Sequence, residues 1–227
     1  MIIITGASGG VGSYLFETYE TLGENVYGTY NSNDSKRTLD IEKLSKVDIV
    51  NNKNVEEWIS SLSLSENITL INCAGISYNA FAHKSDVEKW KNVIDVNIIG
   101  TFNVIRALLG KMRENNYGRI INFSSVTAQK GTPGISAYAA SKAALWGLSK
   151  SIAVENASKG ITINNVNLGY SELGMIEQVP DKFKELIVSQ IPNGEFCKKE
   201  DIFKCVEFIR NNNYMNGSSV DLNGAMF

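Results

Sequence analysis

An apolar strand, a glycine-rich turn and a helix open the chain, and this order constrains the fold more than any other feature. Residues 1–4 form a β-branched run typical of a buried strand. Residues 5–12 follow with the spacing T-G-x-x-x-G-x-G, and residues 14–22 have helical spacing. Glycines let the backbone approach a pyrophosphate, and the amino end of a helix favours its charge. This segment predicts a nucleotide site rather than a tight turn that binds nothing. Its residues are Gly6, Ser8, Gly9, Gly10, Val11 and Gly12.

Strand-like runs alternate with segments of helical spacing along the rest of the chain. Strands are predicted at residues 25–30, 46–49, 68–73, 119–124, 160–166 and 219–222. Helices are predicted at residues 55–62, 85–109, 136–157, 180–190 and 200–210, and Ser85 to Glu88 suggest a capping box at the start of the second. Alternation of this kind is typical of βαβ units. The chain of 227 residues has no linker or repeat. We therefore expect one Rossmann-like, doubly wound α/β domain over residues 1–227, with about seven parallel strands and helices on both faces.

Composition excludes several classes of function. The net charge is −2 and no segment is a basic stripe, so nucleic acid is not an expected partner. No apolar run approaches the roughly 20 residues that span a membrane, and a strand at residue 1 leaves no room for a signal peptide. Three scattered cysteines are typical of reduced thiols, and a single histidine argues against a metal site. These features predict a cytoplasmic protein without a metal or a membrane anchor.

Two of the predicted strands end in polar or small residues. In an open parallel sheet, ligands bind outside the carboxyl ends of the strands. Asn72 is placed to brace neighbouring strands, and Ala74 and Gly75 after it leave room for a ribose, unless the segment is an ordinary turn. Ser125 is interpreted as a hydroxyl that donates to a substrate oxygen, and Ser124 as an ordinary turn residue.

Tyr138 and Lys142 lie four residues apart on a predicted helix and therefore share one face. A nearby ammonium favours the phenolate and lowers the pKa of a tyrosine. A phenol tuned in this way exchanges protons with an alcohol or a carbonyl. Alone, the pair is also compatible with a half-buried tyrosine beside a solvated lysine.

In chain order these motifs resemble those of the short-chain dehydrogenase/reductase family, over nearly the whole chain. Residues 165–169 and 217–224 resemble the family's sixth strand and its last strand and turn. Residues 190–196 and 214–217 resemble segments of the 3-oxoacyl-[acyl-carrier-protein] reductase type. The resemblance implies hydride transfer between a nicotinamide cofactor and a carbonyl or a secondary alcohol.

The resemblance also implies roles for single residues. Tyr138 is the acid or base, Lys142 holds the nicotinamide ribose and tunes Tyr138, Ser125 steadies the substrate oxygen, and Asn97 holds a water that supplies protons to Lys142. The remaining cofactor contacts implied outside the glycine-rich turn are Tyr30, Asn31, Asp48, Ile49, Asn72, Cys73, Ala74, Gly75, Gly169 and Ser171.

The second predicted strand ends without an acid to bind a ribose 2′-hydroxyl, and Asp34 comes slightly late for that role. Lys36 and Arg37 follow. Both cations suit a 2′-phosphate, so NADP(H) is predicted in preference to NAD(H), unless they are solvated loop charges. Two positions depart from the family pattern. Leu168 stands where the family has proline, and Leu173 where it has a threonine against the nicotinamide amide, so Ser171 or the backbone is expected to hold that amide.

The sequence leaves the substrate open. A 3-oxoacyl thioester is one candidate, a sugar or another small alcohol is a second, and a cofactor sensor without catalysis is the third class. The resemblance implies a homo-oligomer, a dimer or tetramer, built on the long helix and the Tyr138 helix. Phe102 and Trp146 are candidate contacts, although core packing explains them equally well. An acyl carrier protein is a further candidate partner. Lys111, Arg113, Lys150 and Lys159 could contact it, but ordinary surface cations are the better interpretation of these four residues.

Overall fold

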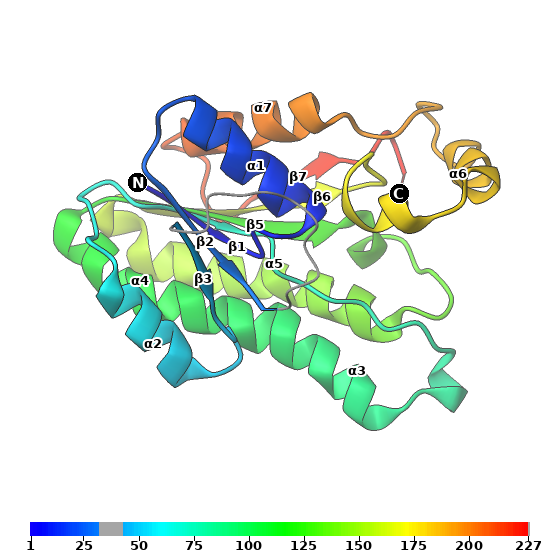
Figure 1. The fold of residues 1–227 in the computed structure, drawn as a ribbon, viewed down its shortest axis with the longest axis horizontal. Coiled ribbons are helices and arrows are strands. Elements are labelled where there is room, and N and C mark those ends of the chain that lie inside the picture. Colours follow the sequence, from blue (N-terminus) through cyan, green and yellow to red (C-terminus); the bar gives the residue numbers. More distant parts are fainter. Residues whose placement is uncertain (32–42, 227) are drawn as a thin grey trace.

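A computed structural model of the protein describes residues 1–31 and 43–226. Its centre is a parallel sheet of seven strands in the order β3-β2-β1-β4-β5-β6-β7, which confirms the predicted Rossmann-like fold (Figure 1). The strand order reverses beside β1, so a ligand crevice is expected outside the carboxyl ends of β1 and β4. The strands are β1 (Ile2–Thr5), β2 (Val26–Tyr30), β3 (Leu44–Lys46), β4 (Thr69–Asn72), β5 (Gly118–Ser125), β6 (Ile161–Leu168) and β7 (Ser219–Leu222).

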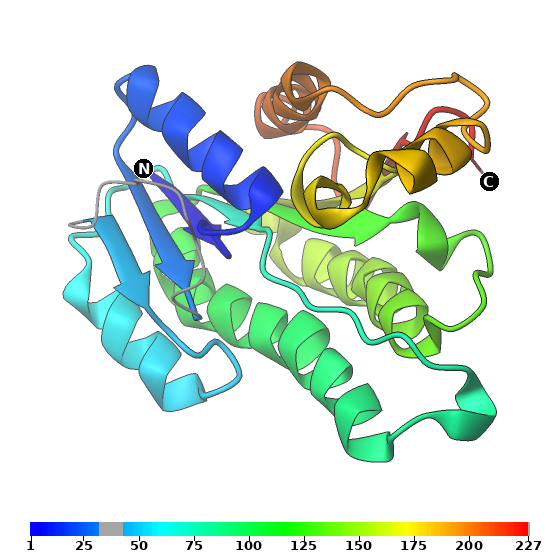
Figure 2. The same ribbon diagram turned by 45° about the vertical axis from the view of Figure 1, so that its right-hand side comes forward.

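Helices cover both faces of the sheet (Figures 1 and 2). One face carries α1 (Gly10–Thr21) and α7 (Lys199–Arg210), with α6 (Asp181–Val188) further along the same side. The other face carries α2 (Asn52–Ser61), α3 (Val87–Ile94), α4 (Thr101–Asn115) and α5 (Ser136–Asn156). Successive side chains of a strand point to opposite faces of the sheet and pack into separate cores. Ile3 packs with α2, α4 and α5, whereas Ile2 and Ile4 pack with α1 and α7. Two buried faces explain why β1 is apolar throughout.

The helices α3 and α4 form one continuous rod through a π-helical turn at Asp95–Gly100. The predicted long helix is confirmed, but the predicted capping box is wrong. Asp86 caps the helix by accepting from the Lys89 backbone N–H at 3.0 Å. Within residues 1–31 and 43–226, this rod alone is long and apolar enough to span a membrane by those two criteria. Its buried residues, among them Val104 and Leu108, pack on the sheet, which accounts for its composition as a core helix.

A row of polar side chains crosses five strands beneath the carboxyl edge. Its members are paired in register: Thr5 of β1, Asn72 of β4, Asn122 of β5, Asn165 of β6 and Ser219 of β7. Each donates to the next, over 3.3, 2.8, 3.4 and 3.2 Å. The expected bracing role of Asn72 is therefore confirmed. Because the asparagines are buried, each of these bonds satisfies groups that would be costly to leave unpaired.

Several predicted boundaries are wrong. The first helix begins at Gly10 rather than at residue 14, and the long helix ends at Asn115 rather than at residue 109. Two further errors have a local cause. The third strand was predicted at residues 46–49, yet β3 ends at Lys46 and the chain then turns. The turn forms because Asp48 Oδ1 accepts the Val50 N–H at 3.0 Å, a local bond that competes with strand pairing. The helix predicted from residue 55 begins at Asn52, because Asn51 caps the N–H groups of Lys53 and Asn54.

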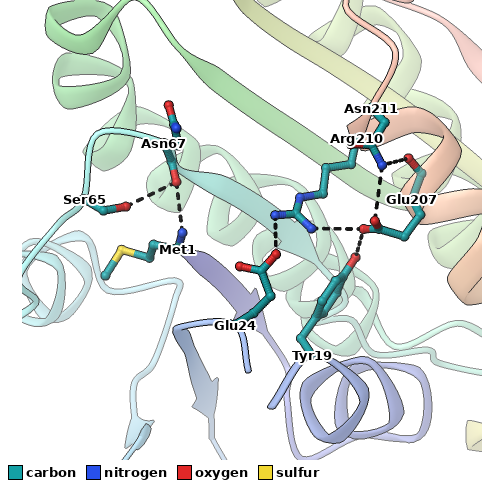
Figure 3. A network of polar contacts seen from close by, with 8 residues as sticks. All are labelled: Met1, Tyr19, Glu24, Ser65, Asn67, Glu207, Arg210 and Asn211. Carbon is teal, nitrogen blue, oxygen red and sulfur yellow. Dashed lines mark hydrogen bonds and ion pairs between the residues drawn. The ribbon is translucent and has the colours of Figure 1, made fainter. Parts of the chain in front are cut away.

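A polar network ties α1 to α7 on the side of the molecule where the chain begins (Figure 3). Tyr19 donates to Glu207 at 2.7 Å, and Arg210 bridges Glu207 and Glu24 at 3.2 and 2.7 Å. The network fixes the outer end of α1, whose other end carries the glycine-rich turn.

Candidate active site

The glycine-rich turn packs closely against the carboxyl end of β4. Gly6 has a φ of +65°, and a Cβ atom there would lie 2.7 Å from the backbone of Ala74. A Cβ atom at Gly12 would lie 2.3 Å from the Gly6 carbonyl oxygen. Gly9 precedes α1 and supplies no side-chain cap. A compact turn at an uncapped helix start is the arrangement that binds phosphate groups.

Ser125 and Tyr138 are brought together at the carboxyl edge. Ser125 ends β5, Tyr138 lies in the first turn of α5, and the Ser125 hydroxyl is close enough to Tyr138 to lower the pKa of its phenol. Thr127 donates its backbone N–H and its hydroxyl to Ser125 Oγ, at 3.2 and 3.0 Å. The proton of Ser125 is thus directed away from Thr127 and can be donated to an oxygen beside Tyr138.

Lys142 is buried between the same elements. Its Nζ donates to the Phe123 carbonyl oxygen at 2.7 Å and lies 5.6 Å from the centre of the Tyr138 ring. A Cβ atom at Gly75 would lie 3.4 Å from this Nζ, so the ammonium faces the end of β4. Ser124 is no turn residue, and that interpretation is wrong. It belongs to β5, and its hydroxyl donates to the Lys142 carbonyl oxygen at 2.9 Å, which fixes α5 on the sheet.

The pKa of Tyr138 shifts opposite to the sequence-based expectation. Burial raises the pKa of this phenol, and the Ser125 hydroxyl offsets the rise in part. Burial also lowers the pKa of Lys142 to about 8, against a smaller effect of the Cys73 thiol. An ammonium that is itself destabilised and bonded to a backbone carbonyl does not dominate the phenol. Tyr138 is therefore protonated at neutral pH in this structure.

Asn97 lies in the π-helical turn and points toward the same centre. Its amide exchanges two hydrogen bonds with the Ile76 backbone, at 2.8 and 3.0 Å, and donates to Ser141 Oγ at 2.9 Å. Ser141 in turn donates to the Tyr138 carbonyl oxygen at 2.8 Å. A Cβ atom at Gly75 would lie 3.3 Å from Asn97 Oδ1, so Asn97 and Lys142 both border Gly75. A π-helical turn inside an α-helix often marks a functional position.

The other predicted contacts lie along the same edge. Cys73, Ala74 and Gly75 follow β4, where the Ala74 N–H donates to the Thr5 hydroxyl at 3.3 Å. A Cβ atom at Gly169 would lie 2.7 Å from Asn223, so only glycine fits there. Tyr30 ends β2 and Asn31 is exposed beyond it. Lys36 and Arg37 lie outside the described residues.

Asp48 and Ile49, two of the predicted cofactor contacts, follow β3. Asp48 is exposed, whereas Ile49 is buried against the π-helical turn at Gly100. Asn103 holds this turn, because its amide donates to the carbonyl oxygens of Ile49 and Val50, both at 3.0 Å.

The segment after β6 closes on the glycine-rich turn. A Cβ atom at Gly10 would lie 2.1 Å from the Gly174 backbone nitrogen. Leu173 packs at the margin of the core under α1 and α7. Ser171 is buried, and its hydroxyl donates to the Leu173 carbonyl oxygen at 3.1 Å. Its oxygen thus remains available only as an acceptor.

Sequence reasoning missed several supporting residues. Thr29 holds the glycine-rich turn, since its hydroxyl accepts the Gly6 N–H at 3.3 Å and its carbonyl accepts the Ala7 N–H at 2.8 Å. Ser141, Asn103 and Thr127 are the others. The available signal was a small polar side chain at a core-facing position, which is buried only with a hydrogen-bond partner.

The four cations suggested for a carrier protein lie at the wrong edge. Arg113 meets the end of α5 by donating to Asn156 Oδ1 at 2.7 Å, and Lys159 lies two residues before β6. Lys111 pairs with Glu114, and Lys150 lies beside Gly217, ahead of β7. All four border the amino ends of the strands. They are therefore remote from Tyr138.

The residues at the carboxyl edge fit a dinucleotide. The turn at Gly6 and Gly12 admits a close phosphate, and Lys142 and Gly75 leave a polar, open position beside Tyr138. Among residues 1–31 and 43–226, no three His, Cys, Asp or Glu side chains gather closely enough to hold a metal ion.

The sequence model of the short chain dehydrogenase family matches residues 1–183 of this chain. The chain belongs to this family. As a short-chain dehydrogenase it is an NAD(P)-dependent oxidoreductase. Its resemblance to the 3-oxoacyl-[acyl-carrier-protein] reductase type is confirmed by relatives that bear that name.

Two named relatives of this short-chain dehydrogenase extend over almost the same length. It is 34% identical to the 3-oxoacyl-[acyl-carrier-protein] reductase of Rickettsia bellii, over 99% of this chain and 95% of that protein. It is also 34% identical to the acetoacetyl-CoA reductase of Rhizobium meliloti, over 99% and 97%. A 3-oxoacyl-[acyl-carrier protein] reductase from Brucella melitensis has the same fold, with a TM-score of 0.89 at 24% identity over 99% of this chain and 90% of that one.

The buried ammonium of this dehydrogenase predicts a pH-dependent stability. Lys142 has a pKa of about 8 in the folded protein, against 10.5 ordinarily. Between these values the unfolded chain retains a proton that the folded protein has lost, so the contribution of Lys142 to stability rises with pH. Relative to Lys142→Met, we expect the wild type to gain up to about 3 kcal/mol of unfolding free energy between about pH 7 and about pH 10.

Urea unfolding of both proteins at each pH measures this gain, and the comparison cancels the titration of other groups. A difference between the two proteins that stays constant over this range would show that the ammonium is not destabilised by burial.

Proposed function

We propose that this short-chain dehydrogenase reduces the 3-oxo group of an acyl thioester and takes NADPH in preference to NADH. The observation that carries the proposal is the convergence of two proton donors, Ser125 and the protonated phenol of Tyr138, beside Lys142. A phenol whose pKa is raised suits the reductive direction, because reduction consumes a proton at the new hydroxyl. The names of the relatives point to 3-oxoacyl and acetoacetyl thioesters.

The protein's own groups provide position and proton transfer. The Ser125 hydroxyl and the Tyr138 phenol donate to the substrate carbonyl oxygen and stabilise the charge that develops there. The bound dinucleotide supplies the hydride. Tyr138 then gives its proton to that oxygen, and Lys142 holds the ribose next to Gly75. Asn97 anchors the solvent connection, and through Ser141 it also fixes the first turns of α5.

A panel of carbonyl substrates tests the proposal. Oxidation of NADPH is followed with acetoacetyl-CoA, a 3-oxoacyl carrier-protein thioester, a keto sugar and a small aliphatic ketone. We expect the thioesters to give a kcat/KM at least about tenfold above the others, a difference of roughly 1.4 kcal/mol in transition-state binding. Preference for the sugar would replace the substrate class but keep the reaction. The absence of turnover with any carbonyl would favour a cofactor sensor.

Cofactor preference is a separate prediction. We expect NADPH to bind at least about tenfold more tightly than NADH, because Lys36 and Arg37 follow β2 and the strand itself ends without an acid to repel a 2′-phosphate, Asp34 coming later. Titration calorimetry of both nucleotides measures the difference. Lys36→Gln with Arg37→Gln should remove it, and Lys53→Gln, which changes an exposed lysine of α2, should not. Tighter binding of NADH by the wild type would overturn the prediction.

We place the protein in the cytoplasm as a homo-oligomer, by analogy with the named reductases. The π-helical turn before α4 and the helix α5 present exposed apolar side chains: Ile99 of the turn is 44% exposed and Val154 of α5 is 85% exposed, and both suit a contact between copies. Phe102 is also exposed on α4. The indole N–H of Trp146 does not serve such a contact between copies, since it donates inward to Asn167 at 2.9 Å.

A further inference from the structure

A chain of hydrogen bonds runs from α5 across β6 to the edge strand β7 and on to the segment after β5. The Trp146 indole donates to Asn167 Oδ1 at 2.9 Å, and Asn167 Nδ2 donates to Asp221 Oδ1 at 2.7 Å. Gln129 Nε2 donates to both oxygens of Asp221, at 3.0 and 3.1 Å. Asn223 completes the chain by donating to Gln129 Oε1 at 3.4 Å. One carboxylate thus receives bonds from two separate elements.

The chemistry of the groups allows only one orientation of this chain. An indole is a donor without acceptor capacity, so it fixes the amide oxygen of Asn167 on the side of Trp146. The amide nitrogen must then face Asp221, and an ionised carboxylate accepts but cannot donate. Gln129 is oriented in the same way, because Asn223 donates to its oxygen and leaves its nitrogen for Asp221. Bonds to a charged acceptor are also the stronger ones.

Trp146 and Gln129, which stand on either side of Asp221 in this chain of hydrogen bonds, lie beside the two halves of the active site. Trp146 is one helical turn from Lys142 and two turns from Tyr138, on the same face of α5. Gln129 directly follows the short 3-10 turn Val126–Ala128, which begins after Ser125, and its N–H closes that turn on Val126 at 3.0 Å. Asp221 therefore joins the helix that carries Tyr138 to the segment that carries Ser125.

We propose that Asp221 is a positioning residue that sets the distance between Ser125 and Tyr138 through Gln129 on one side and Asn167 with Trp146 on the other. The inference rests on the function proposed above. Asp221 touches neither reacting group and lies on the exposed edge strand β7. Its loss should loosen the donor pair without removing either donor, and misplacement of about 1 Å can cost as much as 10²-fold in rate.

Kinetics with acetoacetyl-CoA and NADPH provide the first test. Asp221→Ala and Trp146→Phe should each lower kcat about tenfold while the dissociation constant of NADPH stays within about twofold. Because both changes break one chain, the double variant should be little worse than either single variant. Asp221→Asn keeps an acceptor for Asn167 and should restore kcat to within about threefold of the wild type.

The matched control is Glu114→Ala, which removes an exposed carboxylate with a single ion pair to Lys111 at the opposite edge of the sheet. It should leave kcat unchanged. Wild-type kcat in Asp221→Ala, or fully additive losses in the double variant, would overturn the inference while the proposed reaction stands.

A second measurement does not depend on activity. Hydrogen exchange of the Gln129 backbone N–H reports the turn that Asp221 holds. Both Asp221→Ala and Trp146→Phe should speed this exchange at least about fivefold, and Glu114→Ala should not. An unchanged exchange rate in Trp146→Phe would show that α5 and the Ser125 segment are uncoupled, whatever the substrate proves to be.

Discussion

Replacing Tyr138 by phenylalanine is expected to lower kcat for 3-oxoacyl thioester reduction by about 10²- to 10⁴-fold, the range that general acid catalysis supplies. The change removes the phenol proton and the partner of Ser125 but keeps the ring beside Lys142. The fold and the cofactor site should therefore persist. Steady-state kinetics, with the dissociation constant of NADPH from fluorescence titration, measure both expectations.

The control is Tyr214→Phe, because Tyr214 is fully exposed and remote from the carboxyl edge. It should behave as the wild type. If Tyr138→Phe retained a kcat within tenfold of the wild type, Tyr138 would not be the acid. If instead it lost cofactor binding, the phenol would act in binding rather than in proton transfer.

Replacing Asn122 by valine is expected to destabilise the protein by roughly 2–5 kcal/mol. The change leaves Asn72 Nδ2 without its acceptor and removes the bonds that Asn122 Nδ2 donates to Ser149 and Asn165, all in the interior. A buried donor without a partner costs about 1–3 kcal/mol, and each lost bond about 1 kcal/mol more.

Urea unfolding followed by tryptophan fluorescence measures this loss. The control Asn92→Ala changes an exposed asparagine of α3 and should alter stability by less than about 0.5 kcal/mol. A loss below about 1 kcal/mol for Asn122→Val would mean that the row relaxes or that water satisfies the freed groups.

Much of the fold was predictable because its signals are local. The run at residues 2–4, the glycines after it and the segments of helical spacing each indicate one type of local structure. Predicted element boundaries were wrong where a short polar side chain accepts a hydrogen bond from a backbone N–H two or three residues later. Asp86 replaced the expected cap at Ser85, Asn51 started a helix early, and Asp48 ended a strand. Such bonds depend on fine backbone geometry and leave only a weak pattern in the sequence.

The candidate site divides in the same way. The motif spacing placed Ser125, Tyr138 and Lys142 on elements that the sheet brings together. It gave the wrong direction for the pKa of Tyr138, because burial is set by every element packed around the phenol. It also missed Ser124 as an anchor of α5. The preferred interpretation of Lys111, Arg113, Lys150 and Lys159 as ordinary surface cations agrees with their place at the far edge of the sheet.

The amino-acid sequence alone determined the order of strands and helices and the glycine-rich turn after the first strand. It also determined that a phenol and an ammonium share one helical face. These follow from chain connectivity and from the fixed periods of helix and strand. Only the tertiary structure decided how deeply Tyr138 and Lys142 are buried, and which groups hold them. Burial and long-range hydrogen bonds join residues such as Trp146 and Asp221, whose proximity no local pattern encodes.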